Sequence, residues 1–415
     1  MLVGLTRVGP LRQRVDKCFT VTGGRQAPQA ATVGGIRLEP ARRDGLWYAV
    51  TPLTWLGSPD SRDAWAAQLS RAIGTVGTGG AAVLPTTVPG PGGITPAGGD
   101  VHTLEVASPA EQEVLCNLLR EHVPLLVALT CRTGTVATSG SYWLATSREH
   151  VAARYLASTA PMHLERVITE LRRVDGVAQL ERMDVFPSKE DDGTLTVTVR
   201  CVEGASVAAA RAHVLLLAAL AMHARRLVQD GRRLGHLPQR RLEENRARAV
   251  ARGLSSRMSK DGPGSAPVPA RQLARSLLTD TLAKELDNLR ATSQELFPLI
   301  AAIDLPQLGL ARAATEDELL RGWAADQGAK FAGIAAHVLL NQGPGGPCLT
   351  AAGQLAPGRT SLLLDEWTAI IAARRGGVGT SGPAKRPGQP AAGSGRGDQP
   401  HRRNDQRRPG RGDNR

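Results

Sequence analysis

The alternation of hydrophobic and polar residues predicts short strands and longer helices along most of the chain. Apolar, β-branched and aromatic residues indicate strands at Leu46–Val50, Val101–Val106 and Thr194–Val202. Apolar positions at helical spacing predict helices at Arg62–Ile73, Glu111–His122, Tyr142–Leu156, Pro161–Leu171, Ser206–Asp230, Gln272–Leu289 and Thr315–Leu340. Residues 1–45 are only weakly patterned and predict no element.

Local signals mark where several of these elements begin or end. Ser108–Glu111 is typical of a helix start, with a Ser N-cap, Pro at the first helical position and Glu at the third. Gly231 suits the C-cap of the helix Ser206–Asp230. The apolar run Pro124–Leu129 fits either a buried helix or a strand. Asp261–Pro269 is rich in Gly and Pro and predicts a loop.

The size of the chain predicts one large domain or two. It has 415 residues, of which 41% are hydrophobic, so a sizeable core is expected. Aromatic residues make up only 3%, so Leu, Val and Ala must build that core. The bias toward Ala, Gly and Arg is typical of a GC-rich bacterial genome. We predict a folded domain over residues 1–375 and a separate tail over residues 376–415.

The C-terminal tail, residues 376–415, carries nine Lys or Arg and three Asp or Glu, which is +6 of the total +13. The basic pI therefore does not indicate a basic domain surface. Gly, Pro, Arg, Asn and Gln dominate the tail, and we expect it to be disordered. It has no aromatic residue for base stacking, so nucleic-acid binding is disfavoured against a solubilising or partner-contacting role.

Cysteine content and hydropathy predict a cytoplasmic protein. The five cysteines are odd in number and form no CxxC or zinc spacing, so free thiols are expected. The N-terminus shows no secretory signal. The longest apolar run, Ala212–Ala224, is shorter than the roughly 20 residues that cross a bilayer, so no membrane segment is expected. The Gly-rich stretch Gly74–Gly80 lacks the Gly-Lys-Ser/Thr of a P-loop and predicts an ordinary loop.

An ordered set of motifs lies between Val101 and Gly253. The first follows the pattern Asn-x-x-Arg-x-x-x-Pro-Leu-Leu-x-Ala-Leu, matched by Asn117, Arg120, Pro124, Leu125, Leu126, Ala128 and Leu129. Next comes a strand that ends with Arg200 and Glu203, followed by a long helix and the segment Glu243–Arg246. In order and spacing this stretch resembles the ATP-dependent glutamate–cysteine ligases and their carboxylate–amine ligase relatives.

The resemblance implies an α+β fold with an antiparallel sheet of the glutamine-synthetase type and packed helices. It also implies a reaction that joins a carboxylate to an amine through an acyl phosphate, with ATP and Mg²⁺ and an amino-acid or peptide substrate. The site residues that it implies are Arg200 and Glu203 as catalytic groups, Arg148, Asn245 and Arg246 as substrate or ATP contacts, and Glu105 and Glu203 as metal ligands.

The sequence departs from the family at several polar positions. The family carries an acidic cluster on its first strand, whereas the first fifty residues here contain only Asp16, Glu39 and Asp44 as acids. Thr198 occupies the position of the family's metal-binding Glu, and Phe186 that of the Arg in its Asp-x-Arg-Pro motif. These changes remove a charged metal ligand and a bidentate clamp for phosphate or carboxylate.

The histidine pattern of the family is out of phase in this sequence. His102 is displaced by one residue from the family's His-x-His-x-Gly pattern, which on a strand places it on the opposite face. Glu105 and Glu203 restore part of a metal site if the strands have shifted.

Two functions remain open, with plainer interpretations beside them. The chain is either an ATP-dependent ligase or a catalytically impaired family member that acts as a binding or accessory subunit. A third interpretation, nucleic-acid binding, rests on the tail alone. Arg200 also fits a surface strand, Glu203 a solvated strand end, and Glu243–Arg246 the acidic first turn of a helix.

Overall fold

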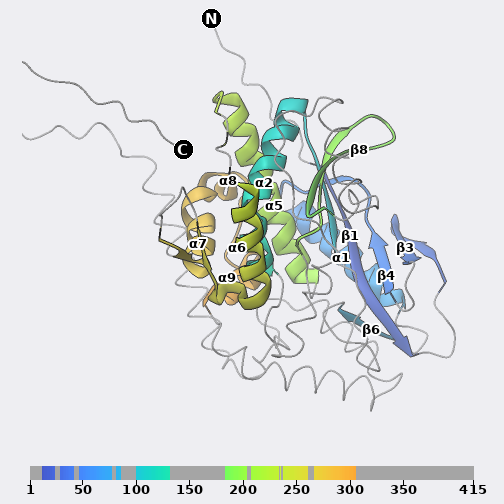
Figure 1. Ribbon diagram of the computed structural model, residues 1–415. Helices are drawn as coiled ribbons and strands as arrows, with labels where there is room; N and C mark the ends of the chain where they lie inside the picture. The colour runs from blue at the N-terminus through green and yellow to red at the C-terminus, as the bar shows by residue number, and fades with distance from the viewer. Residues whose placement is uncertain are drawn as a thin grey trace, which may run out of the picture. The chain divides into compact units, whose positions relative to one another are not determined.

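We analysed a computed structural model of the chain (Figure 1). The structure describes residues 12–23, 29–41, 46–76, 81–85, 100–130, 183–202, 207–232, 234, 237–259 and 266–304. All of them fall within one unit, Met1–Gly376. Three predicted helices lie outside the described residues: Tyr142–Leu156, Pro161–Leu171 and Thr315–Leu340. The predicted tail 376–415 and the candidate site residues Arg148 and Glu203 also lie outside them.

The described strands form one large antiparallel sheet of nine strands, with a separate two-stranded hairpin. Its main order is β2-β3-β4-β1-β7-β9-β8, and β5 and β6 also pair with β1. The strands are β1 (Arg12–Gly23), β2 (Ala31–Val33), β3 (Ile36–Pro40), β4 (Leu46–Val50), β5 (Thr54–Trp55), β6 (Ala81–Pro85), β7 (Val101–Glu105), β8 (Val185–Lys189) and β9 (Leu195–Val199). The hairpin pairs β10 (Arg257–Met258) with β11 (Val268–Pro269), so the end of the predicted loop Asp261–Pro269 is a strand.

Strand β1 is the centre of the sheet, although it lies in the weakly patterned segment 1–45 for which no element is predicted. It pairs with β4 and β5 along one edge and with β7 and β6 along the other. In the first half of the strand, charged residues alternate with buried ones, as in Arg14, Val15 and Asp16. Because charged residues occupy one side of the strand from Arg12 to Asp16, its hydrophobic signal is weak although its position is central.

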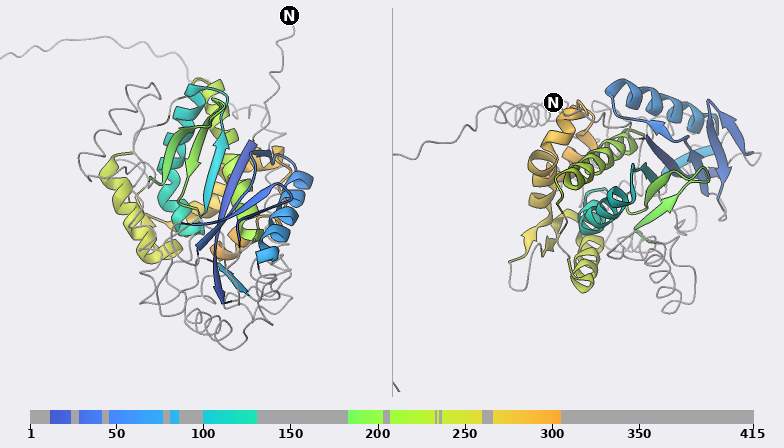
Figure 2. Two further views of the ribbon diagram at one scale, coloured as in Figure 1. Left: turned by 90° about the vertical axis from the view of Figure 1, so that its right-hand side faces the viewer. Right: turned by 90° about the horizontal axis from the view of Figure 1, so that it is seen from above.

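Helices cover one face of the sheet in layers (Figure 2). Helices α1 (Pro59–Val76), α2 (Pro109–Thr130) and α5 (Val207–Gln229) pack against the strands. Beyond α2 and α5 lie the shorter elements of the C-terminal part; these are α6 (Gln239–Arg252), the 3-10 turn η3 (Gly253–Ser255), α7 (Ala270–Ser276), the π-helical turn η4 (Leu277–Thr281), α8 (Ala283–Asn288) and α9 (Phe297–Asp304). Mixed helices and an antiparallel sheet confirm the predicted α+β class.

The core is built mainly from Leu, Val and Ala, as the low aromatic content predicted. A larger cluster joins β7, β8 and β9 to α2, α5 and the C-terminal helices. A smaller cluster joins β1, β3 and β4 to α1 and the first half of α5 through residues such as Val15, Phe19 and Val214. Because α5 contributes to both clusters, it connects the two halves of the sheet.

Helix α5 is long and apolar enough to cross a membrane by length and composition. Its apolar window is 72% buried inside the protein, which is the arrangement of a core helix. The predicted C-cap is also observed, because Gly231 has φ of 63°, a conformation that glycine adopts without strain.

Two helix predictions need correction. The run Pro124–Leu129 continues α2 without a break, so Glu111–His122 was too short. The predicted helix Gln272–Leu289 is divided into α7, η4 and α8, because five residues in the middle take the wider π-helical turn.

The start of α2 follows the predicted capping pattern. Ser108 Oγ accepts a hydrogen bond from the Glu111 backbone N–H at 3.2 Å, and Glu111 Oε2 accepts one from Ala107 N–H at 2.8 Å. We expect Ser108→Ala to lower the free energy of unfolding by about 1 kcal/mol, measured by urea denaturation. Ser255→Ala, at an exposed serine of η3, is the control and should change it by less than about 0.5 kcal/mol. An equal change in both variants would contradict the capping role.

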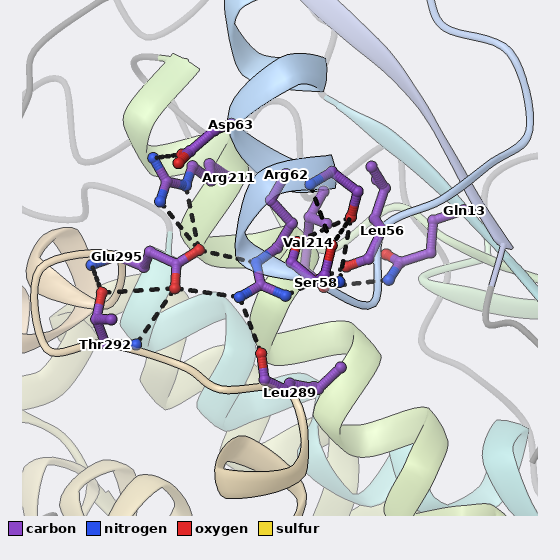
Figure 3. A network of polar contacts seen from close by, with 11 residues as sticks. Gln13, Leu56, Ser58, Arg62, Asp63, Arg211, Val214, Leu289, Thr292 and Glu295 are labelled. Carbon is purple, nitrogen blue, oxygen red and sulfur yellow. Dashed lines mark hydrogen bonds and ion pairs between the residues drawn. The ribbon is translucent and has the colours of Figure 1, made fainter.

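A buried ion-pair network holds α1 against α5 and the segment before α9 (Figure 3). Arg62 of α1 and Glu295 have side chains that are 0% and 2% exposed, and they share two hydrogen bonds of 2.8 and 3.1 Å. Arg211 of α5 contacts the same carboxylate at 3.0 Å and also pairs with Asp63 at 2.5 Å. The network therefore links three segments that are far apart in the sequence.

Candidate functional site

The two faces of the central strand differ sharply in chemistry. Gln13 Nε2 donates to Val214 O of α5 at 3.3 Å, and Val15 packs in the core beneath α1 and α5. Because side chains alternate along a strand, Arg12, Arg14 and Asp16 point to the opposite face. None of the helices in the described part of the chain covers that face (Figure 2). We call it the charged face.

One cross-strand row of the charged face carries three ionisable residues. Val50 of β4 is paired with both Arg37 of β3 and Asp16 of β1. On the other side Asp16 is opposite Val101 of β7. Extending the β7–β9 register by one residue places Arg200 opposite Val101. Two strand spacings separate Arg200 from Asp16, or about 10 Å between their Cα atoms, so Asp16 has an arginine in its row on each side.

Asp16 is a carboxyl group with an unusual environment. Burial raises the pKa of Asp16 to about 6, and the charges of Glu39 and Glu190 act in the same direction, whereas those of Arg14 and Arg37 oppose it. Arg14 Nε lies 3.5 Å from Asp16 Oδ1. A carboxyl that exchanges its proton near neutral pH is suited to general base catalysis.

The next row continues across the sheet from Arg14. Arg14 Nη1 donates to Glu190 Oε2 at 2.7 Å, and Arg14 Nη2 donates to Thr103 Oγ1 at 3.3 Å. Thr103 is opposite Thr198, the residue that the sequence resemblance aligns with the metal-binding Glu of the ligases. Thr198 Oγ1 shares a hydrogen bond of 2.8 Å with Ser188 Oγ. The row thus passes from a guanidinium to neutral hydroxyl groups.

The third row contains the predicted metal ligand Glu105, but another residue holds it. Arg12 Nε and Nη2 donate to the two carboxylate oxygens of Glu105 at 2.6 and 2.7 Å. This hydrogen bond and the charge of Glu105 raise the pKa of Arg12. A bidentate guanidinium pair of this kind is strong and geometrically specific.

The described residues do not fit the Mg²⁺ centre that the resemblance implies. Both oxygens of Glu105 already accept hydrogen bonds from Arg12, and Thr198 offers a neutral hydroxyl in place of a carboxylate. Across the described ranges, no group of three or more His, Cys, Asp or Glu side chains is placed to hold a metal ion. Glu203, the other predicted ligand, is outside these ranges.

The residues Asn245 and Arg246 of α6 make contacts within the protein. Asn245 Nδ2 donates to Ser259 O at 2.8 Å, and its Oδ1 accepts from Ser259 N–H at 3.0 Å. Arg246 binds both carboxylate oxygens of the fully buried Asp184 at 2.6 and 3.0 Å. These contacts fasten α6 to β10 and to the start of β8. The predicted contacts with substrate or ATP stay predictions.

The structure brings Arg200 and Arg246 to the same end of β8 and β9. The Arg200 N–H donates to Asp184 O at 2.8 Å, and Arg246 holds the side chain of Asp184. Glu105 lies elsewhere, since it is opposite Thr196, four residues before Arg200. Four residues of strand span about 13 Å, so Glu105 and Arg200 occupy different rows of the sheet.

Sequence analysis missed the residues at the centre of the charged face. Arg12, Arg14 and Asp16 recur at every second position, which puts all three on one face of a strand. That spacing was the available signal, but it carries weight only once Arg12–Gly23 is known to be a strand. Arg37 and Glu190 had no such signal, because pairing between distant segments places them there.

The face beneath the helices holds a second polar cluster. Lys17 Nζ donates to Asp100 Oδ1 at 2.8 Å, and both side chains are fully buried. His102 lies on this face, as its shifted position predicted, and burial lowers its pKa to about 4. His213 of α5 is also buried, and burial together with the charge of His102 and Lys17 lowers its pKa well below the usual value.

Comparison with known proteins gives distant structural likenesses. No model of a protein family matches the chain. No curated protein matches it either. A bifunctional glutathione synthetase from Pasteurella multocida is 14% identical, with a TM-score of 0.46, over 87% of this chain and 56% of that one. The chain therefore spans just over half of that protein.

Two further solved structures are similar at the same low level. The complex between the prokaryotic ubiquitin-like protein Pup and its ligase PafA matches at 11% identity and a TM-score of 0.39, over 88% of this chain and 79% of that one. A glutamine synthase homolog matches at 13% identity and a TM-score of 0.36, over 76% of this chain and 71% of that one. All three proteins carry the names of ligases, synthetases or synthases, but similarities this distant assign no activity.

Proposed function

We propose that the protein is a carboxylate–amine ligase, which joins an amino-acid or peptide carboxylate to an amine at the charged face and uses ATP to activate the carboxylate. The observation that supports this most directly is Asp16, a partly buried carboxyl with Arg14 beside it and Arg37 and Arg200 in its row. Attack of an amine on an acyl phosphate needs a base for the amine proton and cationic groups for the anionic partners.

Each part of this arrangement has a role in the proposal. Asp16, ionised above its pKa of about 6, accepts the proton that the amine loses as the amide bond forms. Arg37 and Arg200 lie on either side of it, where guanidinium groups can bind the substrate carboxylate and the phosphate released from it. A γ-glutamyl bond of the glutamate–cysteine ligase type is the narrower form of the same proposal.

A second function, a binding or accessory protein without catalysis, is favoured by a different observation. Glu105 and Glu190 are each neutralised by an arginine of β1, so neither carboxylate is free to hold a metal–nucleotide complex. In that case the charged face binds an amino-acid or peptide ligand and passes it to, or senses it for, a partner.

Release of ADP from ATP, with mixed amino acids and Mg²⁺, tests the ligase proposal. We expect Asp16→Asn to reduce the rate at least about 100-fold, because a general base contributes 10²–10⁴-fold. Wild-type turnover should fall as the pH drops below about 6, where Asp16 gains a proton, and the variant should not show this fall.

Asp230→Asn is the matched control, since Asp230 is exposed at the end of α5 and away from the charged face. It should keep the wild-type rate and pH profile. No ADP release by wild type, with retained binding of amino acids that Arg37→Ala weakens, would support the accessory function in place of catalysis.

A further inference from the structure

Three acidic residues of the charged face lie beside arginines of strand β1. Arg12 takes both oxygens of Glu105 at 2.6 and 2.7 Å. Two residues further along β1, Arg14 takes Glu190 at 2.7 Å and lies 3.5 Å from Asp16. The three acids come from β7, the β8–β9 turn and β1, yet each one faces a guanidinium of β1.

We propose that the guanidinium groups of Arg12 and Arg14 take the place of divalent cations on the charged face, so that this face binds anionic ligands directly and without a bridging metal. The inference deepens the proposed function, because it concerns the same face and its carboxylate substrate.

Geometry and charge both support this assignment. Glu105, Glu190 and Asp16 are hard oxygen donors of the type that Mg²⁺ prefers, and they surround the two arginine side chains. The side chains of Arg12 and Arg14 are 38% and 28% exposed, so they stand at the surface of the face, where a ligand arrives. A metal ion would have to displace a bidentate pair and meet a second positive charge about 7 Å away.

The neutral positions of the face fit the same explanation. Where a further carboxylate would be needed to complete a metal site, the face has Thr198 and Ser188, whose hydroxyls share a hydrogen bond of 2.8 Å. Thr196 joins the same group through Ser188 at 2.8 Å. Hydroxyl groups can donate to a carboxylate or phosphate oxygen, which suits an anion better than a divalent cation.

Binding of Mn²⁺ without any nucleotide tests the inference. It is measured as the loss of the free-ion signal in electron paramagnetic resonance. We expect wild type and Glu105→Gln to bind Mn²⁺ equally, within about twofold, because Glu105 is not a ligand. Glu244→Gln is the control, as Glu244 is exposed on α6 and pairs only with Arg240 among the described contacts. A wild-type Mn²⁺ site that Glu105→Gln or Glu190→Gln weakens tenfold, and Glu244→Gln does not, overturns the proposal.

A second variant removes the two arginines instead of the acidic residues. Arg12→Met/Arg14→Met leaves Glu105, Glu190 and Asp16 without their guanidinium partners, and we expect it to bind Mn²⁺ at least tenfold more tightly than wild type. A folded double variant, with its far-ultraviolet circular dichroism retained, that gains no Mn²⁺ affinity also overturns the proposal. If that variant does not fold, the comparison of wild type with Glu105→Gln still decides. No nucleotide enters these measurements, so failure of the ligase proposal shows separately, as absent ADP release.

Discussion

Replacing Arg62 by Met is expected to lower the free energy of unfolding by about 3–5 kcal/mol, because it leaves a buried carboxylate with half of its compensation. Arg62 is the sole partner of Glu295 in α1 among the described contacts, and its guanidinium also donates to Leu56 O at 3.3 Å and Leu289 O at 3.1 Å. Methionine keeps an unbranched apolar side chain and removes all of these bonds. Urea denaturation measures the change.

Arg71→Met is the matched control, since Arg71 is exposed on the same helix and contacts only Ala67 O among the described residues. It should change stability by less than about 0.5 kcal/mol. The double variant Arg62→Met/Glu295→Gln should lose less than the sum of its single variants, because the uncompensated charge is gone. Additive losses would contradict the coupling between the two side chains.

The same network has a dependence on pH with a defined sign. Burial alone would raise the pKa of Glu295, but hydrogen bonds and charge from Arg62 and Arg211 outweigh it, so the pKa is lowered from 4.5. A carboxyl whose folded pKa lies below its unfolded value stabilises the fold above pH 4.5 and loses that contribution as the pH falls through the folded value. The difference in the free energy of unfolding between wild type and Arg62→Met should therefore become smaller in strong acid.

The fold class was expected from the resemblance of Val101–Gly253 to the ligase family, whereas the apolar periodicity of the sequence located the main helices. Ser206–Asp230 was placed within one residue at each end of α5, since its apolar run and Gly231 define both limits. Two features went against local rules. Pro124 remains inside α2, and the π-helical turn at Leu277–Thr281 interrupts a regular apolar pattern. Packing in the core outweighs local preference at both places.

The candidate site was harder to predict, because it depends on which strands become neighbours. Arg200 was recognised from its motif, and the register now puts it in the row of Asp16. Asp16 itself was noticed only as one of few acids near the N-terminus. Its neighbours Arg37 and Glu190 are 21 and 174 positions away in the chain, and no local pattern records such pairings. Glu105 was correctly placed on a strand, but its partner Arg12 lay in the segment without a prediction.

Acid should destabilise the protein over a higher pH range than carboxylates alone would explain, because of His102. Its side chain is fully buried, and neither ring nitrogen has a hydrogen-bond partner among the described residues. The pKa of His102 is lowered by burial from 6.5 to about 4, despite the attraction of Asp100, and Lys17 adds repulsion. Between these values the unfolded chain binds a proton that the folded protein does not, so stability falls as the pH drops from about 6.5 to 4.

The expected loss is about 3 kcal/mol from His102, measured as the urea midpoint at several pH values. His213 faces the same cluster from α5 and contributes in the same direction. Asp16 works in the opposite direction, since its raised pKa lets the folded protein take up a proton first as the pH falls through about 6. The dependence of wild-type stability on pH is the sum of these contributions, so only a variant at His102 isolates the contribution of His102.

His102→Leu should remove that share of the acid slope while keeping stability near pH 8 close to that of wild type. A leucine fills similar space beside α5 and leaves no unsatisfied polar atom, which makes an apolar replacement nearly neutral or stabilising there. His122→Gln is the control, because the half-buried His122 on α2 bonds to Leu118 O within its own helix. It should keep the wild-type slope. If His102→Leu keeps that slope too, another group takes up the proton that produces it, and the prediction for His102 is wrong.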